Sequence, residues 1–223
     1  VTVVAADSAD ADAMRQLFAR FNTSLPPLRG IVHAAGRIDY RPLAQIGAAE
    51  LDDVCRAKVQ GTLVLHELTR GGQFPLDFFV LFSSGASVWG SRHLLHYSAA
   101  NAALDAIAHA RRTAGLPATA INWGWWEGGA TTADAESLFA QAGLRRMATD
   151  DALAAMADAI AGGTPQRVVA AFDWDRFKRI FESTGSRLLD RIETTATEPA
   201  TAQPRGTLLR DLQQLPAADV RAR

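Results

Sequence analysis

The sequence predicts an α/β fold built on a doubly wound parallel sheet. Short apolar runs rich in β-branched residues alternate along the chain with longer segments that carry apolar residues at helical spacing. This alternation is typical of a parallel sheet with helices on both faces. The strand-like runs are apolar almost without interruption, as expected for strands buried on both sides.

The segments predicted to be strands are short, apolar and bounded by turn-forming or small residues. They are residues 1–7, 30–36, 76–83, 117–123 and 167–172. The segments predicted to be helices lie between and after them, at about 8–21, 50–69, 97–114, 134–143, 149–161 and 174–181. Asp7 and Ser8 are expected to cap the first of these helices. In the second, Leu51, Val54, Val59, Leu63 and Leu65 are expected to face mostly inward.

The composition excludes several classes of protein. The chain has 23 basic and 24 acidic residues, so its balance of charge gives no reason to expect binding to nucleic acid or an anionic membrane. The single cysteine, Cys55, excludes an internal disulfide framework and a cysteine-cluster metal site. The sequence contains no pattern of a signal peptide and no apolar run of about 18 residues. These features predict a cytoplasmic protein.

Three polar residues follow the pattern of a reactive site at the edge of the predicted sheet. Ser84 comes just after a buried strand, where doubly wound sheets bind ligands. Tyr97 begins the next helix, and Asn101 lies one turn later on the same face. A phenol at this place could donate a proton to a developing alkoxide if a cation were nearby, and Lys58 is the available candidate. Asn101 could instead hydrogen-bond only to the helix backbone.

At these residues the chain resembles the ketoreductase domains of modular, type I polyketide synthases, within the short-chain dehydrogenase superfamily. The resemblance covers residues 1–182. Its motifs are VVAAD at 3–7, GIVHAAG at 30–36, AKVQGT at 57–62, VLFSSGASVWGS at 80–91, YSAANAALDA at 97–106, GLPATAINWGWWEGG at 115–129 and FDWDRF at 172–177. Asn101 holds the position where ordinary short-chain dehydrogenases have lysine, and the lysine lies upstream. The resemblance implies a Rossmann-like sheet.

The resemblance also implies a reaction and a set of roles. NADPH would reduce a β-ketoacyl thioester, bound to an acyl carrier protein, to a β-hydroxyacyl thioester. Tyr97 would be the proton donor, Ser84 would bind the ketone oxygen, and Lys58 would lower the Tyr97 pKa. Asn101 would organise a proton-relay water. The residues implied for cofactor binding are Asp7, Ala35, Gly36, Lys58, Tyr97 and Gly124.

Stereochemistry is implied by residues near the tyrosine. Trp89 lies eight residues before Tyr97, as in the A-type domains that give an L-hydroxyl. Residues 37–40 read Arg-Ile-Asp-Tyr in place of the Leu-Asp-Asp of B-type domains. Leu94, three residues before Tyr97, fits neither A-type subtype, so the subtype stays open. Trp125 is expected to line the cleft and anchor a lid.

One part of the family's pattern is missing, because no Gly-rich strand-turn-helix precedes the motif at 3–7. We therefore expect a partial domain at 1–182 that needs an upstream nucleotide-binding half, and that neither folds well nor reduces a substrate alone. A linker is predicted at 183–206, and 207–223 resembles the start of an acyl carrier protein. The expected partners are this carrier and other synthase domains. The alternative function is a redox-inactive, structural or epimerising domain.

Overall fold

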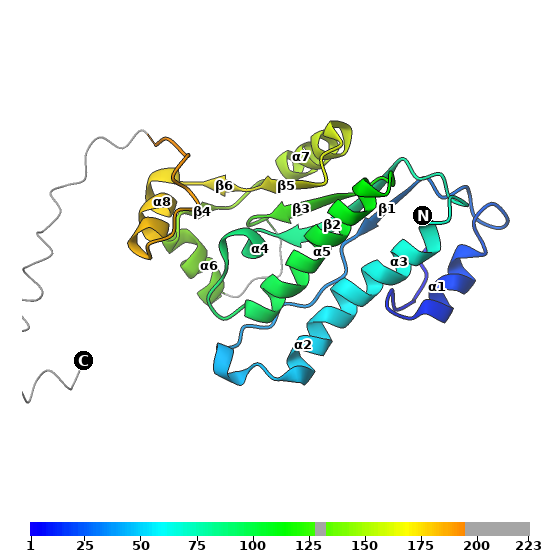
Figure 1. Cartoon of the computed structure of the whole chain (residues 1–223), viewed down its shortest axis with the longest axis horizontal. Helices are drawn as coiled ribbons and strands as arrows, with labels where there is room; N and C mark the ends of the chain where they lie inside the picture. Colours follow the sequence, from blue (N-terminus) through cyan, green and yellow to red (C-terminus); the bar gives the residue numbers. More distant parts are fainter. Residues whose placement is uncertain (128–132, 195–223) are drawn as a thin grey trace, which may run out of the picture. The chain divides into compact units, whose positions relative to one another are not determined.

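The computed structural model describes residues 1–127 and 133–194 and confirms the α/β architecture (Figure 1). In this part of the chain a 4-stranded sheet has the order β1-β2-β3-β5, and every neighbouring pair is parallel. Its strands are β1 (Gly30–His33), β2 (Phe78–Ser84), β3 (Thr119–Trp123) and β5 (Gln166–Val169). None of the described helices is long and apolar enough to cross a membrane.

Helices cover both faces of this sheet, as the pattern of apolar residues predicts. Alternate residues of a strand point to opposite faces, so Phe79 and Leu81 join one apolar cluster and Val80 joins another. The first cluster receives side chains from α1 (Ala11–Phe18), α3 (Gly61–Thr69) and α5 (Leu95–Thr113). The second receives side chains from α7 (Thr149–Gly162), which ends at Gly163 in the left-handed conformation.

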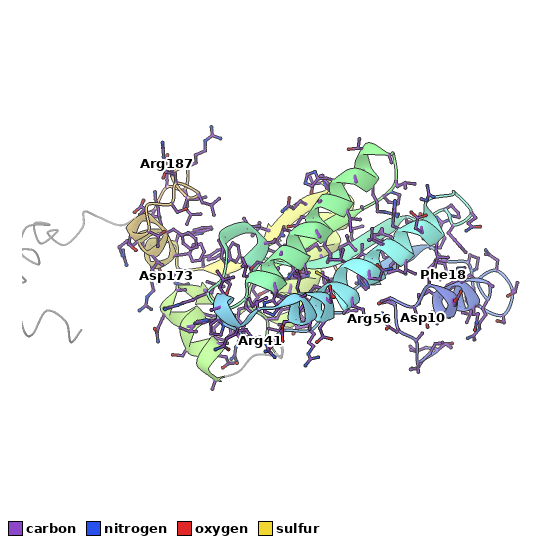
Figure 2. All side chains as sticks on the ribbon, turned by 60° about the horizontal axis from the view of Figure 1, so that its bottom comes forward. Asp10, Phe18, Arg41, Arg56, Asp173 and Arg187 are labelled. Carbon is purple, nitrogen blue, oxygen red and sulfur yellow. The ribbon has the colours of Figure 1, made fainter. Side chains whose placement is uncertain are left out.

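The start of the chain differs from the sequence prediction. Residues 1–7 form no strand, and the side chains of Val1 and Val3 are fully or largely exposed. Extended backbone becomes a strand only beside a hydrogen-bonding neighbour, and the neighbour of β1 in the described sheet is β2. The N-cap of α1 is Asp10 rather than Asp7 or Ser8, because its carboxylate accepts hydrogen bonds from the backbone N–H groups of residues 12 and 13 (Figure 2).

The predicted helix at 50–69 is confirmed but is not uniformly α-helical. It consists of α2 (Ala48–Cys55), a π-helical segment η2 (Arg56–Gln60) and α3. The wider π-helical turn changes which of the later positions face inward. Val54 and Leu65 are buried as expected and Val59 is half-buried, whereas Leu63 after the turn and Leu51 before it are exposed.

Beyond β3 the chain differs from the prediction in the number of strands. The predicted strand at 167–172 is divided into β5 and β6 (Ala171–Phe172), and β6 pairs antiparallel with β4 (Leu144–Arg145). Helix α6 (Ala133–Gln141) precedes β4, and a short helix α4 (Ala86–Trp89) follows β2. A second unit begins at residue 174, and in it α8 (Trp174–Ser183) buries the ring of Phe177.

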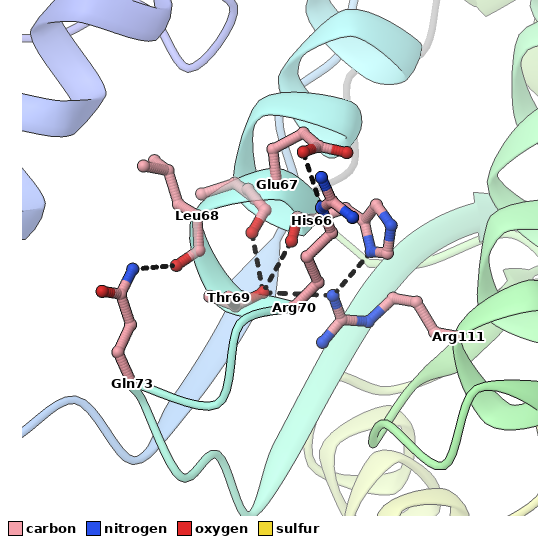
Figure 3. Close-up of polar contacts among 8 residues, drawn as sticks. His66, Glu67, Leu68, Thr69, Arg70, Gln73 and Arg111 are labelled. Atoms are coloured by element: carbon pink, nitrogen blue, oxygen red, sulfur yellow. Dashed lines mark hydrogen bonds and ion pairs between the residues drawn. The ribbon is translucent and has the colours of Figure 1, made fainter.

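The side chain of Arg111 ties α5 to the end of α3 (Figure 3). Its guanidinium is buried and stacks 3.8 Å from the ring centroid of Phe79. It contacts His66 Nδ1 at 3.0 Å and donates to Thr69 Oγ1 at 3.1 Å and to the carbonyl of Pro117 at 3.2 Å. Burial lowers the pKa of Arg111 to about 10, and no ion pair joins it to a carboxylate within residues 1–127 and 133–194.

Replacing Arg111 with alanine is expected to lower the free energy of unfolding by about 3–5 kcal/mol, because it leaves a cavity and unpaired polar groups. The matched control is Arg70→Ala, which removes an exposed ion pair with Glu67. This substitution should change the free energy of unfolding by less than about 1 kcal/mol. Urea unfolding of the complete ketoreductase measures both. An equal effect of the two substitutions would contradict this account of Arg111.

Candidate active site

A cleft of about 400 Å³ lies at the carboxyl ends of β1, β2 and β3, the edge where doubly wound sheets bind ligands. It brings together three of the four residues predicted to be catalytic, namely Lys58, Ser84 and Tyr97. The residues predicted for cofactor binding or stereocontrol that also line it are Gly36, Gly124, Trp89, Leu94 and Trp125. Asn101, Asp7 and Ala35 do not line the cleft.

Tyr97 lies in the first turn of α5, where it is half-buried and lines the cleft. Burial raises the pKa of Tyr97, and contacts with the side chains of Ser84 and Asn101 oppose that rise. The net shift of the Tyr97 pKa is upward, which is opposite to the direction expected from Lys58. The phenol is therefore protonated at neutral pH and able to donate a proton.

Lys58 extends from the π-helical segment into the cleft and is 4% exposed. Its Nζ donates a hydrogen bond of 2.9 Å to the carbonyl of Phe82 and lies 5.4 Å from the ring centroid of Tyr97. Burial lowers the pKa of Lys58 to about 8, and the charge of Asp105 opposes that shift. Gly36 packs closely against this lysine, because a Cβ there would lie 2.8 Å from Lys58 Cε and the end of the lysine side chain would have to shift.

Asn101 is fully buried one turn after Tyr97. Its Nδ2 donates a hydrogen bond of 2.7 Å to the backbone carbonyl of Tyr97, as the simpler interpretation of this residue expects. Its Oδ1 is also buried and has no hydrogen-bond partner among the described residues. An unpaired buried acceptor is costly, so this oxygen is available to a water molecule or to a proton relay.

The two serines at the end of β2 have different surroundings. Ser83 is buried, and its hydroxyl donates to the carbonyl of Asn101 and accepts from Asn122 Nδ2 at 3.0 Å. Ser84 is half-buried, and its Oγ accepts a hydrogen bond of 3.2 Å from the backbone N–H of Ala86. Both serines line the cleft, but the Ser83 hydroxyl is engaged by Asn101 and Asn122, whereas the Ser84 hydroxyl can still donate a hydrogen bond.

Tryptophan rings form one wall of the cleft. The ring of Trp89 lies against Gly85, where a Cβ would lie 1.8 Å from it, and packs edge-on to Phe172 at 5.3 Å. Trp125 contacts Phe139 at 5.7 Å, and the guanidinium of Arg146 lies 4.7 Å from the Trp125 ring centroid. Trp125 is also among the residues that line the cleft. The lid that it is expected to anchor stays a prediction, and residues 128–132 lie outside the described residues.

Sequence reasoning missed Tyr40, which also lines the cleft. Its loop contains the short 3-10 helix η1 (Leu43–Gln45) and is joined to the loop before α5 by a hydrogen bond of 2.8 Å from Arg41 N to the carbonyl of His93. Burial and the neighbouring Tyr97 raise the pKa of Tyr40. The aromatic residue four positions after Gly36 was the available signal.

Four of the residues predicted to contact the cofactor line the cleft, namely Gly36, Lys58, Tyr97 and Gly124. Gly124 also packs tightly, because a Cβ there would lie 2.5 Å from Ala170 Cβ. Asp7 is exposed, and its carboxylate accepts from the N–H of Ala9 and from Arg56, both at 2.8 Å. These contacts lower the pKa of Asp7. The glycine-rich turn that binds a pyrophosphate has no counterpart in the sequence.

Comparison with known proteins agrees with this geometry. The family described as "KR domain" matches residues 1–128. Erythronolide synthase EryA3 from Saccharopolyspora erythraea is 44% identical over 197 residues, which are 87% of this chain and 6% of that protein. A solved structure of A-type ketoreductases from a modular polyketide synthase has a TM-score of 0.76 at 38% identity, covering 81% of this chain and 38% of that one.

A solved C2-type ketoreductase from a modular polyketide synthase has a TM-score of 0.78 at 34% identity, covering 86% of this chain and 42% of that one. Likeness to both types means that the overall fold does not distinguish them. The chain spans less than half of either solved ketoreductase. Both the sequence and the structure place this chain in the KR domain family, the ketoreductases of modular polyketide synthases.

Proposed function

We propose that the chain carries the active-site half of a ketoreductase that uses NADPH to reduce a β-ketoacyl thioester, bound to an acyl carrier protein, to a β-hydroxyacyl thioester. The observation that carries this proposal is the meeting of Tyr97, Ser84 and Lys58 in one cleft at the carboxyl edge of the sheet. A phenol, a hydroxyl and a cation are the groups needed to bind and protonate a ketone oxygen.

In this proposal each residue has a defined task. NADPH, when bound, would supply the hydride for the reduction. The hydroxyl groups of Ser84 and Tyr97 hold the ketone oxygen, and Tyr97 donates its proton to that oxygen as it becomes an alkoxide. The cation of Lys58 stabilises the phenolate that remains. The free Oδ1 of Asn101 holds the water through which Tyr97 recovers its proton.

Cofactor binding is proposed to be shared between two parts of the ketoreductase. Lys58, Tyr97, Gly36 and Gly124 hold the nicotinamide riboside, and Ala35 and Asp7 hold the adenosine. An upstream nucleotide-binding half supplies the pyrophosphate site. The ketoreductase region is 1–182, with a linker at 183–206 and an acyl-carrier-like segment at 207–223; residues 195–223 lie outside the described part of the chain.

The product is proposed to have the L-configuration, on the basis of Trp89. Its ring lines the cleft close to Ser84, at the end of a four-residue helix that begins directly after β2. Leu94 and Trp125 line the same space and limit the substituents that fit there. Chiral analysis of the β-hydroxyacyl product tests this assignment.

The experiment that tests the function uses the full synthase polypeptide, NADPH and a β-ketoacyl thioester of N-acetylcysteamine. We expect consumption of NADPH and formation of the β-hydroxyacyl thioester. The alternative is a redox-inactive domain, structural or epimerising, and either form predicts no consumption of NADPH. An epimerising domain further predicts exchange of the α-hydrogen of an α-methyl substrate in deuterated water, which a structural domain does not.

The pH dependence of the reaction follows from Lys58. Its pKa is about 8, so its charge is present below that pH and is lost as the pH rises through it. The raised pKa of Tyr97 keeps the phenol protonated over the same interval. We therefore expect kcat/KM for reduction to be constant near neutral pH and to fall above about pH 8. A kcat/KM that rises between pH 8 and 10 would contradict the role of Lys58.

A further inference from the structure

The buried carboxylate of Asp105 has no role in the proposed mechanism, although it lies near the active-site residues. Asp105 is 8% exposed. It lies on α5 eight residues after Tyr97, and Asn101 lies midway between the two. Residues four apart share a helical face, so all three point toward the ends of β2 and β3. A buried carboxylate is costly unless it is hydrogen-bonded or paired with a cation.

The carboxylate of Asp105 contacts two polar side chains, those of Ser87 and Asn122, that also contact the backbone or side chains around Ser84. Ser87 Oγ lies 2.7 Å from Asp105 Oδ2 and 2.8 Å from the carbonyl of Ser84, and its single proton goes to one of these acceptors at a time. Asn122 Nδ2 lies 2.9 Å from both oxygens of Asp105 and 3.0 Å from Ser83 Oγ. In the sheet Asn122 is the register partner of Ser83. One carboxylate therefore fixes residues on both sides of Ser84.

Asp105 also acts on Lys58. Lys58 is buried, and its described hydrogen bond goes to a neutral carbonyl group. The titratable groups that face it are His33 from β1 and Tyr97 and Asp105 from α5. Burial lowers the pKa of His33, which leaves that ring neutral near pH 7. Asp105 is the anion among these groups, and its charge is the one that raises the pKa of Lys58 against the effect of burial.

We propose that Asp105 is a positioning residue of the ketoreductase active site, which fixes the turn that carries Ser84 through its contacts with Ser87 and Asn122. The inference rests on the proposed reductase function, but its effect on Lys58 can be measured without turnover. A purely structural network would stabilise the fold without altering the charge of the lysine. The state of the Lys58 amine therefore separates the two interpretations.

The test is the pH dependence of chemical labelling of Lys58, in which a small amine-reactive reagent modifies the neutral amine and peptide mass spectrometry locates the product. The sequence contains only one other lysine, Lys178, which serves as the internal control. In the wild type we expect half-maximal labelling of Lys58 at a pH of about 8. In Asp105→Asn we expect this midpoint to fall by about one pH unit, with Lys178 unchanged.

Asp105→Asn keeps the size of the side chain, and Asn122 can rotate its amide to accept from the new group through its unpaired Oδ1. The matched control is Ser87→Ala, which removes one hydrogen bond to Asp105 without changing its charge. It should leave the labelling midpoint of Lys58 in place. A folded Asp105→Asn protein with the wild-type midpoint would overturn the charge effect.

Turnover is measured in the same preparations of the full synthase. We expect Asp105→Asn to lower kcat about tenfold or more, and to move the alkaline fall of the pH profile of kcat to lower pH.

If Asp105→Asn fails to fold, Asp105→Glu replaces it. The midpoint of Lys58 labelling should then stay near that of the wild type, while kcat falls because the longer side chain no longer fits Ser87 and Asn122. An unchanged kcat in a folded variant would overturn the positioning role. A wild type without reductase activity would refute the proposed function, whereas the labelling result would still decide the effect on Lys58.

Discussion

Tyr97→Phe is expected to lower kcat for ketone reduction by about 10²–10⁴-fold, because the variant keeps the aromatic ring but loses the proton donor. The ring packs beside Lys58, and phenylalanine preserves that packing. Affinity for NADPH and thermal stability should change little. Steady-state reduction of a β-ketoacyl thioester, with a fluorescence titration of NADPH, measures both quantities.

The matched control for Tyr97→Phe is Tyr40→Phe, since these are the two tyrosines of the sequence and both line the cleft. Tyr40 lies outside the set formed by Ser84, Tyr97 and Asn101, so its loss is expected to lower kcat by less than about tenfold. Full activity of Tyr97→Phe would refute its role as the proton donor. A larger loss in Tyr40→Phe would move that role to Tyr40.

Lys58→Met is expected to lower kcat by about 10²–10³-fold, because the methionine fills the space of the lysine stem but supplies no charge to the phenolate. The alkaline fall of kcat/KM near pH 8 should disappear, since the group that causes it is gone. A pH profile of the variant, measured at saturating NADPH, separates this loss from weaker cofactor binding.

Lys178→Met is the control for Lys58→Met. Lys178 lies in α8, outside the proposed site, and contacts Glu182 and the carbonyl of Ile192. We expect it to keep the wild-type kcat and pH profile. A Lys58→Met enzyme that retains the alkaline limb would show that another group titrates near pH 8.

Most of the sheet and its helices could be predicted from the sequence, because buried parallel strands and amphipathic helices leave strong periodic patterns. The strand at 78–84 and the helix at 95–113 agree with the predicted segments within a few residues. Residues 1–7 have the same apolar pattern but form no strand. A strand forms only where a neighbouring strand pairs with it, and the pattern of the segment itself does not reveal whether that neighbour is present.

The candidate site was predictable where the residues follow a strand end or share a helical face, as Ser84, Tyr97 and Asn101 do. Lys58 could be placed only by resemblance, because its approach to Tyr97 depends on a π-helical turn that the sequence pattern does not predict. The upward shift of the Tyr97 pKa could not be predicted, since it results from burial by the folded chain. Asp105 has no signal of its own beyond its spacing from Tyr97.

The most direct test of the central claim follows a deuterium label from the reactive position of NADPH into the product of the full synthase. The account predicts deuterium at the carbon that carries the new hydroxyl group. In Tyr97→Phe the rate of deuterium transfer should fall by the same factor as kcat. It is contradicted if the wild-type protein binds NADPH and the β-ketoacyl thioester but the label never reaches that carbon.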